Sequence, residues 1–376
     1  MQLKRFIQQE TVLSVAIVLA VLSSFFVYPD RQYIDYIDFR TLGILFSLMT
    51  VMAGLGRQGM FDRMGQALLS RTGGILQLVL VLVGLCFFGS MFITNDVALM
   101  TFVPFTFAVL SNLGRQIRHR IALPVVCMQT IAANLGSMLT PIGNPQNLYL
   151  YSKSSMSIVQ FVELMFPYTI VSLVLLAVWA VLLCYGQKEK LYALNITKQK
   201  YISSDNKIVV LYVILFVVCL FAVIHILPYG IVFAIVLICT FFVDRITLRR
   251  VDYSLLLTFV AFFIFIGNLG RVPAFSAWIQ EIISGREVPV AVLASQITSN
   301  VPAALLLSGF THNIEALVIG TNIGGLGTLI ASMASLISYR QIAREMPHGK
   351  GKYFVMFTIS NIIFLVILLV EWVGLG

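Results

Sequence analysis

The segment Thr140-Pro141-Ile142-Gly143-Asn144-Pro145-Gln146-Asn147 lies inside the apolar stretch 121–150. Each of its two prolines removes a backbone donor and disfavours helix in the residue before it. A helix over 121–150 must therefore break here, and the break frees carbonyl and amide groups. In a membrane such groups are tolerated only where they line a cavity within the protein. We therefore predict a broken helix whose Asn144 and Asn147 side chains face a ligand.

The composition of the whole chain indicates a membrane protein. Of its 376 residues 59% are hydrophobic and 11% charged, whereas an ordinary soluble domain has roughly 25% charged residues. Apolar runs of about 20 residues, enough to cross a bilayer, recur from end to end. We predict an all-α polytopic protein with nine full spans: 11–28, 39–56, 121–150, 158–185, 207–226, 227–243, 253–270, 313–338 and 353–374.

Two further apolar segments, 74–112 and 288–311, carry polar residues at their middles. The second is too short for two crossings, which need roughly 40 residues. We therefore predict a re-entrant hairpin with its tip at Ser299 and Asn300. The first segment could form two spans on length alone, but its polar middle, Thr94-Asn95-Asp96, favours a second hairpin.

The basic residues indicate the orientation in the membrane. Of the 25 Lys and Arg residues, all but five fall in loops on one side, which the positive-inside rule assigns to the cytoplasm. The N-terminus is then inside and the C-terminus outside. The net charge is +9, but the basic residues do not form the stripe interleaved with aromatic residues that is typical of a nucleic-acid-binding protein. The five exceptions are Arg31, Arg40, Lys153, Arg271 and Arg286.

An internal repeat organises the sequence. Asp38-Phe39 followed by Leu55-Gly56-Arg57 recurs with the same internal spacing as Asp252-Tyr253 followed by Leu269-Gly270-Arg271. Thr94-Asn95 recurs in the second half as Ser299-Asn300. The pattern Asn134-x-Gly136-x-x-x-Thr140-x-Ile142 then recurs, in the same order along the chain, as Asn322-x-Gly324-x-x-x-Thr328-x-Ile330.

The two copies are expected to run in opposite directions through the membrane. The span 39–56 is assigned outside to inside and its partner 253–270 inside to outside. The predicted organisation is a first repeat over 1–186, with hairpin 74–112 and broken helix 121–150. A loop and linking span over 187–226 follow, and then the inverted repeat over 227–376, with hairpin 288–311 and broken helix 313–338. Inverted repeats with interrupted helices are typical of alternating-access carriers.

The interrupted helices also suggest the chemistry of the cargo. Half-helix N-termini favour an anion, and exposed C-terminal carbonyls favour a cation. No Lys or Arg lies at predicted mid-membrane depth, so amides and hydroxyls would hold the anion. Asp96 is the carboxylate expected near the membrane centre, where an ionisable group is costly and usually functional. An alternative role for Asp96 is to cap the helix that begins at Val97.

The motifs around these breaks and tips resemble the ion transporter superfamily. That superfamily includes arsenite permeases, Na⁺/H⁺ antiporters, citrate-type permeases and divalent-anion/Na⁺ symporters. The resemblance implies an elevator-type carrier of a small anion that forms a homodimer in a bacterial plasma membrane. In the dicarboxylate branch the tips are paired Ser-Asn-Thr motifs. Here Asp96 and Val301 replace the third residue of each tip.

The residues predicted to form the site follow from the breaks, the tips and this resemblance. The substrate would be bound by Thr94, Asn95, Asn144, Asn147, Ser299, Asn300, Thr328 and Ser332. The coupling ion, Na⁺ or H⁺, would be bound by Asp96, Asn95, Asn134, Thr140, Gly143, Asn300, Asn322 and Gly325. No other cofactor and no transition metal is expected, because the five cysteines have no CxxC spacing.

Three other functions remain open from the sequence. A Na⁺/H⁺ antiporter would use Asp96 for exchange and have no organic substrate. A channel is less favoured, since two broken-helix sets suit alternating access better than an open pore. An enzyme has little support, because neither an HExxH nor a GxSxG motif occurs.

Overall fold

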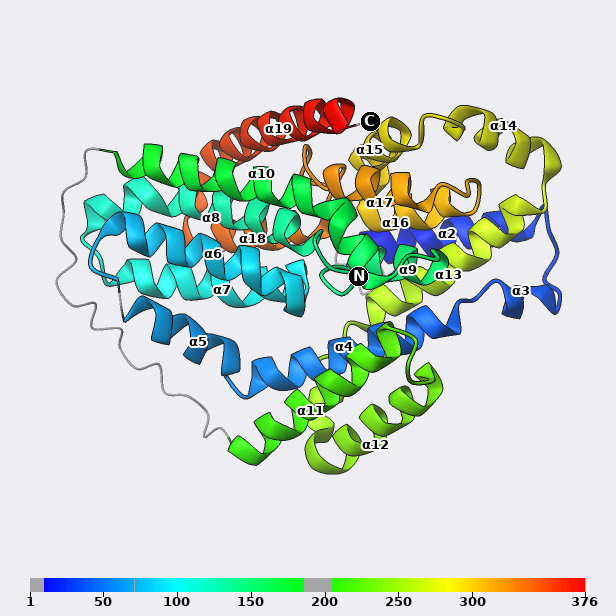
Figure 1. Cartoon of the computed structure of the whole chain (residues 1–376), viewed down its shortest axis with the longest axis horizontal. Helices are drawn as coiled ribbons and strands as arrows, with labels where there is room; N and C mark the ends of the chain where they lie inside the picture. The colour runs from blue at the N-terminus through cyan, green and yellow to red at the C-terminus, as the bar shows by residue number, and fades with distance from the viewer. Residues whose placement is uncertain (1–9, 71, 186–204, 376) are drawn as a thin grey trace.

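The computed structural model describes residues 10–70, 72–185 and 205–375, and these fold into helices (Figure 1). Most of the predicted loop between the repeats, 187–204, lies outside the described residues. In the first half the helices are α2 (Thr11–Ser24), α3 (Gln32–Asp35), α4 (Phe39–Arg57), α5 (Met60–Leu69), α6 (Ile75–Ile93), α7 (Asn95–Ser111), α8 (Arg115–Ser137), α9 (Pro145–Lys153) and α10 (Ile158–Cys184). In the second they are α11 (Asn206–Val223), α12 (Tyr229–Leu248), α13 (Tyr253–Gly270), α14 (Pro273–Ile283), α15 (Glu287–Thr298), α16 (Asn300–Ser308), α17 (Ile314–Ile323), α18 (Met333–Glu345) and α19 (Lys350–Leu375).

The described residues contain seven helices long and apolar enough to cross a membrane, not the nine expected. Six of the nine expected spans are found: α4, α10, α11, α12, α13 and the 347–375 helix. The spans 121–150 and 313–338 are divided by their predicted breaks, and α2 has only 14 residues because it ends at Ser24. The seventh long helix is α6.

The two segments predicted as hairpins each form a helix, a break and a second helix. α15 and α16 have 12 and 9 residues, so at 1.5 Å per residue neither reaches across a hydrocarbon core of about 30 Å. α6, with 19 residues, is long enough to do so on its own. The helix lengths are therefore compatible with a re-entrant hairpin in the second half, and the hairpin of the first half stays a prediction.

The start of each repeat is built in the same way. Asp38 caps α4 by accepting from Thr41 N at 3.0 Å, and Asp252 caps α13 by accepting from Leu255 N at 2.9 Å. The cap residues share one backbone conformation, with φ/ψ of −79°/83° and −78°/82°. Each carboxylate satisfies an amide that the first turn of a helix leaves free.

Helix packing exchanges partners between the halves. α2 packs along α13, and α12 packs along α4, so each initial helix lies against the other half. α6, α7 and α8 pack together at one end of the molecule, and α15, α16 and α17 pack together towards the other (Figure 1). This arrangement brings the breaks of the two halves together between the two helix groups.

Candidate binding site

The chain reverses at two residues with the same unusual backbone. Thr94, between α6 and α7, has φ/ψ of 66°/150°, and Ser299, between α15 and α16, has 81°/154°. This region is almost exclusive to glycine and costs of the order of 1–3 kcal/mol for other residues. A strained residue at the same place in both halves is a reason to look for a function there.

The two broken helices restart with matching caps. Asn144 is the N-cap of α9, and its Oδ1 accepts from Asn147 N at 2.8 Å. Pro145 follows at the first helical position, where its missing N–H costs nothing. Ser332, which the sequence repeat aligns with Asn144, is the N-cap of α18 in a similar extended conformation. The breaks over 138–144 and 324–332 thus lie where the sequence placed them.

Each tip is bonded to the break of its own half. Asn95 N donates to Gly143 O at 3.1 Å, and Asn300 N donates to Ala331 O at 2.9 Å. Thr140 Oγ1 donates to Met91 O at 2.5 Å, and Thr328 Oγ1 donates to Gln296 O at 3.3 Å. In both pairs of bonds the partners occupy positions that the sequence repeat aligns. Each tip and break therefore form one unit.

A network of side-chain amides joins the two units. Asn134 Oδ1 accepts from Asn95 Nδ2 at 3.2 Å and from Ser332 Oγ, in the other half, at 3.0 Å. Asn322 Oδ1 accepts from Asn144 Nδ2 at 3.1 Å, and Asn322 Nδ2 donates to Asn147 Oδ1 at 2.6 Å. The asparagines are all at most 5% exposed.

The electrostatics of this network suit an anion. The helices α7, α9 and α18 each begin at or directly after a residue of the network. Each helix N-terminus carries a partial positive charge. No Lys or Arg takes part in the network's hydrogen bonds within the described residues. Oriented amides and helix dipoles are therefore the groups available to neutralise a negative ligand.

Asp96 is bonded to the network through its backbone, whereas its carboxylate Oδ1 makes no hydrogen bond. Its backbone N–H donates to Asn95 Oδ1 at 2.9 Å, whereas its carboxylate Oδ1 is buried with no hydrogen-bond partner. An unpaired buried carboxylate oxygen is costly unless a proton or a cation satisfies it. The alternative role of Asp96 as the cap of a helix beginning at Val97 is not seen, because α7 begins at Asn95 and Asp96 lies inside its first turn.

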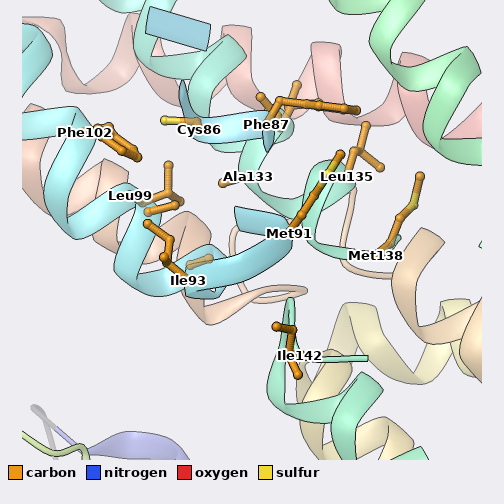
Figure 2. Close-up of a cluster of buried hydrophobic side chains, with 14 of the residues drawn as sticks. Cys86, Phe87, Met91, Ile93, Leu99, Phe102, Ala133, Leu135, Met138 and Ile142 are labelled. Carbon is orange, nitrogen blue, oxygen red and sulfur yellow. The ribbon is translucent and has the colours of Figure 1, made fainter. Parts of the chain in front are cut away.

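Apolar packing fixes the first tip. Figure 2 shows Met91 and Ile93, before the tip, and Leu99, after it, among buried side chains of α6, α7 and α8. Ile142 lies apart from these side chains, on the break of the neighbouring helix. A Cβ on Gly136 would lie 2.0 Å from Phe87 O, so α6 and α8 touch backbone to backbone. The polar network therefore rests on a rigid apolar support.

The predicted residues divide into three groups. Six lie in the amide network: Asn95, Asn134, Asn144, Asn147, Asn322 and Ser332. Four lie at the tips and breaks but outside that network: Thr94, Ser299, Thr140 and Thr328. The other four lie beside the network: Asp96, Gly143, Asn300 and Gly325. Of these, Gly325 approaches Asn300 closely, since its Cβ position is 3.0 Å from Asn300 Nδ2.

Three polar residues of the site lie outside the predicted binding sets. Ser137 and Ser335 accept from Asn144 and Asn134, at 3.2 and 3.4 Å. Gln296 Nε2 donates to Gly324 O and Leu326 O, both at 2.9 Å, and so closes the second break. Its repeat partner is Met91, so the repeat gave no indication of it. A glutamine inside an apolar segment, three residues before the tip, was the available signal.

The described side chains do not form a ligand set for a transition metal. Among the described residues no group of three or more His, Cys, Asp or Glu side chains is placed to hold a metal ion. The candidate ligands at the site are instead amide, hydroxyl and carbonyl oxygens with one carboxylate, which are hard ligands suited to Na⁺ or to a proton.

The sequence is similar to a family of transporters and to several membrane proteins. The sequence model described as citrate transporter, CitMHS, matches residues 8–315. The inner membrane protein YbiR of Escherichia coli is 29% identical over 347 residues, 89% of each chain. An uncharacterized transporter of Methanocaldococcus jannaschii, MJ0456, is 28% identical over 87% of each chain. A rice silicon efflux transporter, LSI3, is 33% identical over 33% of this chain and 25% of its own.

Proposed function

Because this chain belongs to the citrate transporter (CitMHS) family, we propose that it is an ion-coupled carrier of a small anion, a carboxylate or an inorganic oxyanion. It is a multi-pass protein of the plasma (inner) membrane and a transporter, not an enzyme. The observation that carries the proposal is the convergence of half-helix N-termini on a buried amide network into which none of the described Lys or Arg side chains bonds.

The substrate anion is proposed to bind between the two tips. The N-termini of α7 and α16 and the caps of α9 and α18 would share its negative charge. Since amides and hydroxyls rather than described guanidinium or ammonium groups form the network, the site suits a small anion with few charges better than a polyanion. Thr94, Asn95, Asn144, Ser299, Asn300 and Ser332 are the groups we propose to contact it, with Asn147 and Thr328 beside them.

Coupling is proposed to run through Asp96. Its buried, unpartnered oxygen would take up a proton or help to bind Na⁺. Asn95, Asn134, Thr140 and Gly143 in the first half, and Asn300, Asn322 and Gly325 in the second, are proposed to complete the coupling-ion sites. The second half has Val301 at the place of Asp96, so coupling would depend mainly on the first.

The movement is proposed to be an elevator-type alternating access. The matched tips, breaks and caps support two inverted repeats, with 74–112 and 288–311 as re-entrant hairpins, an inside N-terminus and an outside C-terminus. The tip-and-break units would move together against the helices α2, α4, α11, α12 and α13, which we call the frame. A homodimer held together through the frame is part of this proposal.

The second candidate function is a Na⁺/H⁺ antiporter without an organic substrate. It is favoured by one observation, the isolated carboxylate of Asp96 beside the asparagine network. The direction of transport is open in either case.

Purified protein in liposomes tests both candidates. Citrate, succinate, arsenite, sulfate, phosphate and silicic acid would be offered under an imposed Na⁺ or proton gradient. We expect gradient-driven accumulation of one of them, and expect Asp96→Asn to abolish the gradient dependence. Asp62→Asn, on α5 of the same half, is the matched control. If no anion moves while a Na⁺ pulse changes the lumenal pH, the antiporter is the correct function.

A further inference from the structure

One contact between the frame and the tip-and-break units breaks the symmetry of the molecule. The hydroxyls of Thr41, in the first turn of α4, and Ser152, near the end of α9, lie 2.9 Å apart. Ser152 Oγ also donates to the capping carboxylate of Asp38 at 3.4 Å. α4 belongs to the frame and α9 to the first tip-and-break unit, so this contact closes the space between them at the Asp38 end of α4.

The repeat identifies the counterpart of this contact. Asp38 corresponds to Asp252, because the two residues cap α4 and α13 in the same conformation. Ser152 corresponds to Arg340, because each lies eight residues after the matched caps Asn144 and Ser332. The counterpart of the observed contact is therefore a pair of opposite charges, Asp252 and Arg340.

The counterpart contact is open. Neither of the two ion pairs among residues 10–70, 72–185 and 205–375 joins Asp252 to Arg340, and both side chains are exposed. The contacts inside the units behave differently, since the bonds of Asn95 with Gly143 and of Asn300 with Ala331 are both made. These tip-to-break bonds are thus made in both halves, whereas the contact between the frame and a unit is made in one half only.

The two contacts lie at opposite ends of the frame. Arg57, at the end of α4, pairs with Asp244, shortly before α13 begins, at 2.9 Å. Arg271, just after the end of α13, pairs with Asp30, before α4 begins, at 2.7 Å. α4 and α13 are therefore antiparallel, so Asp38 and Asp252 mark opposite sides of the molecule.

We propose that Arg340 pairs with Asp252 in a second conformation, in which the Thr41–Ser152 contact is broken. The inference rests on the proposed alternating-access function, and it assigns a closing contact to each side. The present conformation is closed at the Asp38 side and open at the Asp252 side. An inverted repeat that has two equivalent arrangements exchanges them by movement of the units against the frame.

The two closing contacts differ in charge, so salt should affect them differently. The Asp38 side is closed by hydroxyls and a capping carboxylate, whereas the Asp252 side would be closed by an exposed ion pair. Salt screens an exposed ion pair but hardly affects a hydroxyl contact. Raising the ionic strength should therefore favour the conformation seen here.

Disulfide trapping in native membranes tests the inference. Two double variants, Thr41→Cys with Ser152→Cys and Asp252→Cys with Arg340→Cys, would be oxidised in parallel. We expect both to crosslink. Higher salt should speed the first, which keeps the Asp252–Arg340 ion pair, and should not affect the second, which lacks it. The control is Asp252→Cys with Gln341→Cys, which loses the same cap but turns the second cysteine away around α18. Crosslinking of the Thr41–Ser152 pair alone, under all conditions, would overturn the inference.

A charge change tests the same contact without a cysteine at position 340. Arg340→Asp places a second negative charge opposite Asp252, so the Thr41–Ser152 pair should crosslink about two- to fivefold faster. Adding Asp252→Arg should restore the original rate, and an unchanged rate in both variants would contradict the pairing. These measurements need no transport, so crosslinking at both sides without anion uptake would refute the proposed function and leave this inference standing.

Discussion

The side-chain amide of Asn144 donates to Asn322 Oδ1 at 3.1 Å, although 178 residues separate them along the chain. The repeat aligns Asn144 with Ser332, and Asn322 with Asn134. The counterpart contact is therefore the bond that Ser332 Oγ donates to Asn134 Oδ1, at 3.0 Å. In each half, the residue that caps the helix after the break donates a hydrogen bond to an asparagine of the other half. Such a reciprocal exchange is what a two-fold axis produces in a dimer interface, and here it lies within one chain.

Substituting Asn322 should impair binding more than stability. Asn322→Ala removes the acceptor of Asn144 Nδ2 in the other half and the donor to Asn147 Oδ1. Interhelical hydrogen bonds in membranes contribute roughly 0.6 to 1.7 kcal/mol. Because the freed amides are proposed to orient the substrate, we expect the anion affinity to fall by about tenfold, which corresponds to roughly 1.4 kcal/mol. Substrate-induced thermal stabilisation of purified protein measures this change.

The matched control is Asn361→Ala. Asn361, on α19, is also buried, but its amide bonds only to Phe357 O in its own helix, at 2.8 Å. We expect its unfolding temperature to change as much as that of Asn322→Ala, while the anion affinity stays unchanged. Equal losses of affinity in the two variants would show that Asn322 acts through stability alone.

The strained tips predict a gain of stability that costs function. Thr94→Gly and Ser299→Gly place glycine in a conformation that other residues adopt only at a cost of roughly 1–3 kcal/mol. The unfolding temperature should therefore rise, less any loss from greater chain entropy of the unfolded state. Transport should fall, because the tip hydroxyl is lost. A lower unfolding temperature in both variants would mean that the strain is not relieved.

Much of the architecture could be predicted because proline, glycine and the repeat report directly on the backbone. The break over 138–144 followed from two prolines, and that over 324–332 from Gly324, Gly325 and Gly327 at the positions that the repeat aligns with the first break. Among the described residues seven helices rather than nine are long and apolar enough to span. Two of the expected nine are divided at their predicted breaks, and the span 11–28 is shorter than expected because hydropathy does not register where a helix ends. α2 ends at Ser24, within a segment that remains apolar to Tyr28.

The site was harder to predict where a residue has no repeat partner. Asn95, Asn134, Asn300 and Asn322 were found because the repeat aligns each with another asparagine, and Asn144 and Asn147 because they lie at the proline break. Gln296 has Met91 as its counterpart. Asp30 and Asp244 were missed for another reason. The repeat aligns them with each other, as it aligns Arg57 with Arg271, and the four pair crosswise, but only a search for partners across halves would have linked them. The roles of all these residues in binding remain predictions.

Close packing at Gly136 predicts the most damaging small substitution. Gly136→Ala would place a methyl group 2.0 Å from the carbonyl oxygen of Phe87, a backbone atom that cannot move aside. Because α6 and α8 support the first tip, overpacking here should lower the unfolding temperature and the yield of folded protein. Gly230→Ala, on α12, is the control, since nothing lies within 4 Å of its added methyl group. Comparable behaviour of the two variants would contradict the close approach.

The two crosswise ion pairs should differ sharply in their contribution to stability. Asp244 interrupts α12, with φ/ψ of −152°/56°, and its side chain is only 2% exposed. It accepts from Arg57, from Tyr212 OH at 3.2 Å and from Thr247 Oγ1 at 2.8 Å. Asp244→Asn leaves Arg57, itself 24% exposed, without its counter-charge. Removing one partner of a buried pair typically costs about 3–5 kcal/mol, so the unfolding temperature should fall clearly.

The matched variant at the other end of the frame is Asp30→Asn. Its partner Arg271 and Asp30 itself are each 38% exposed, and Arg271 keeps its bond to Tyr36 OH at 3.1 Å. Water and salt can replace the lost carboxylate there, so the unfolding temperature should stay close to that of the wild type. In Asp244→Leu combined with Arg57→Met, part of the loss should be recovered, because no charge is left buried and unpaired. Equal destabilisation by Asp244→Asn and Asp30→Asn would show that burial does not set the contribution of these pairs.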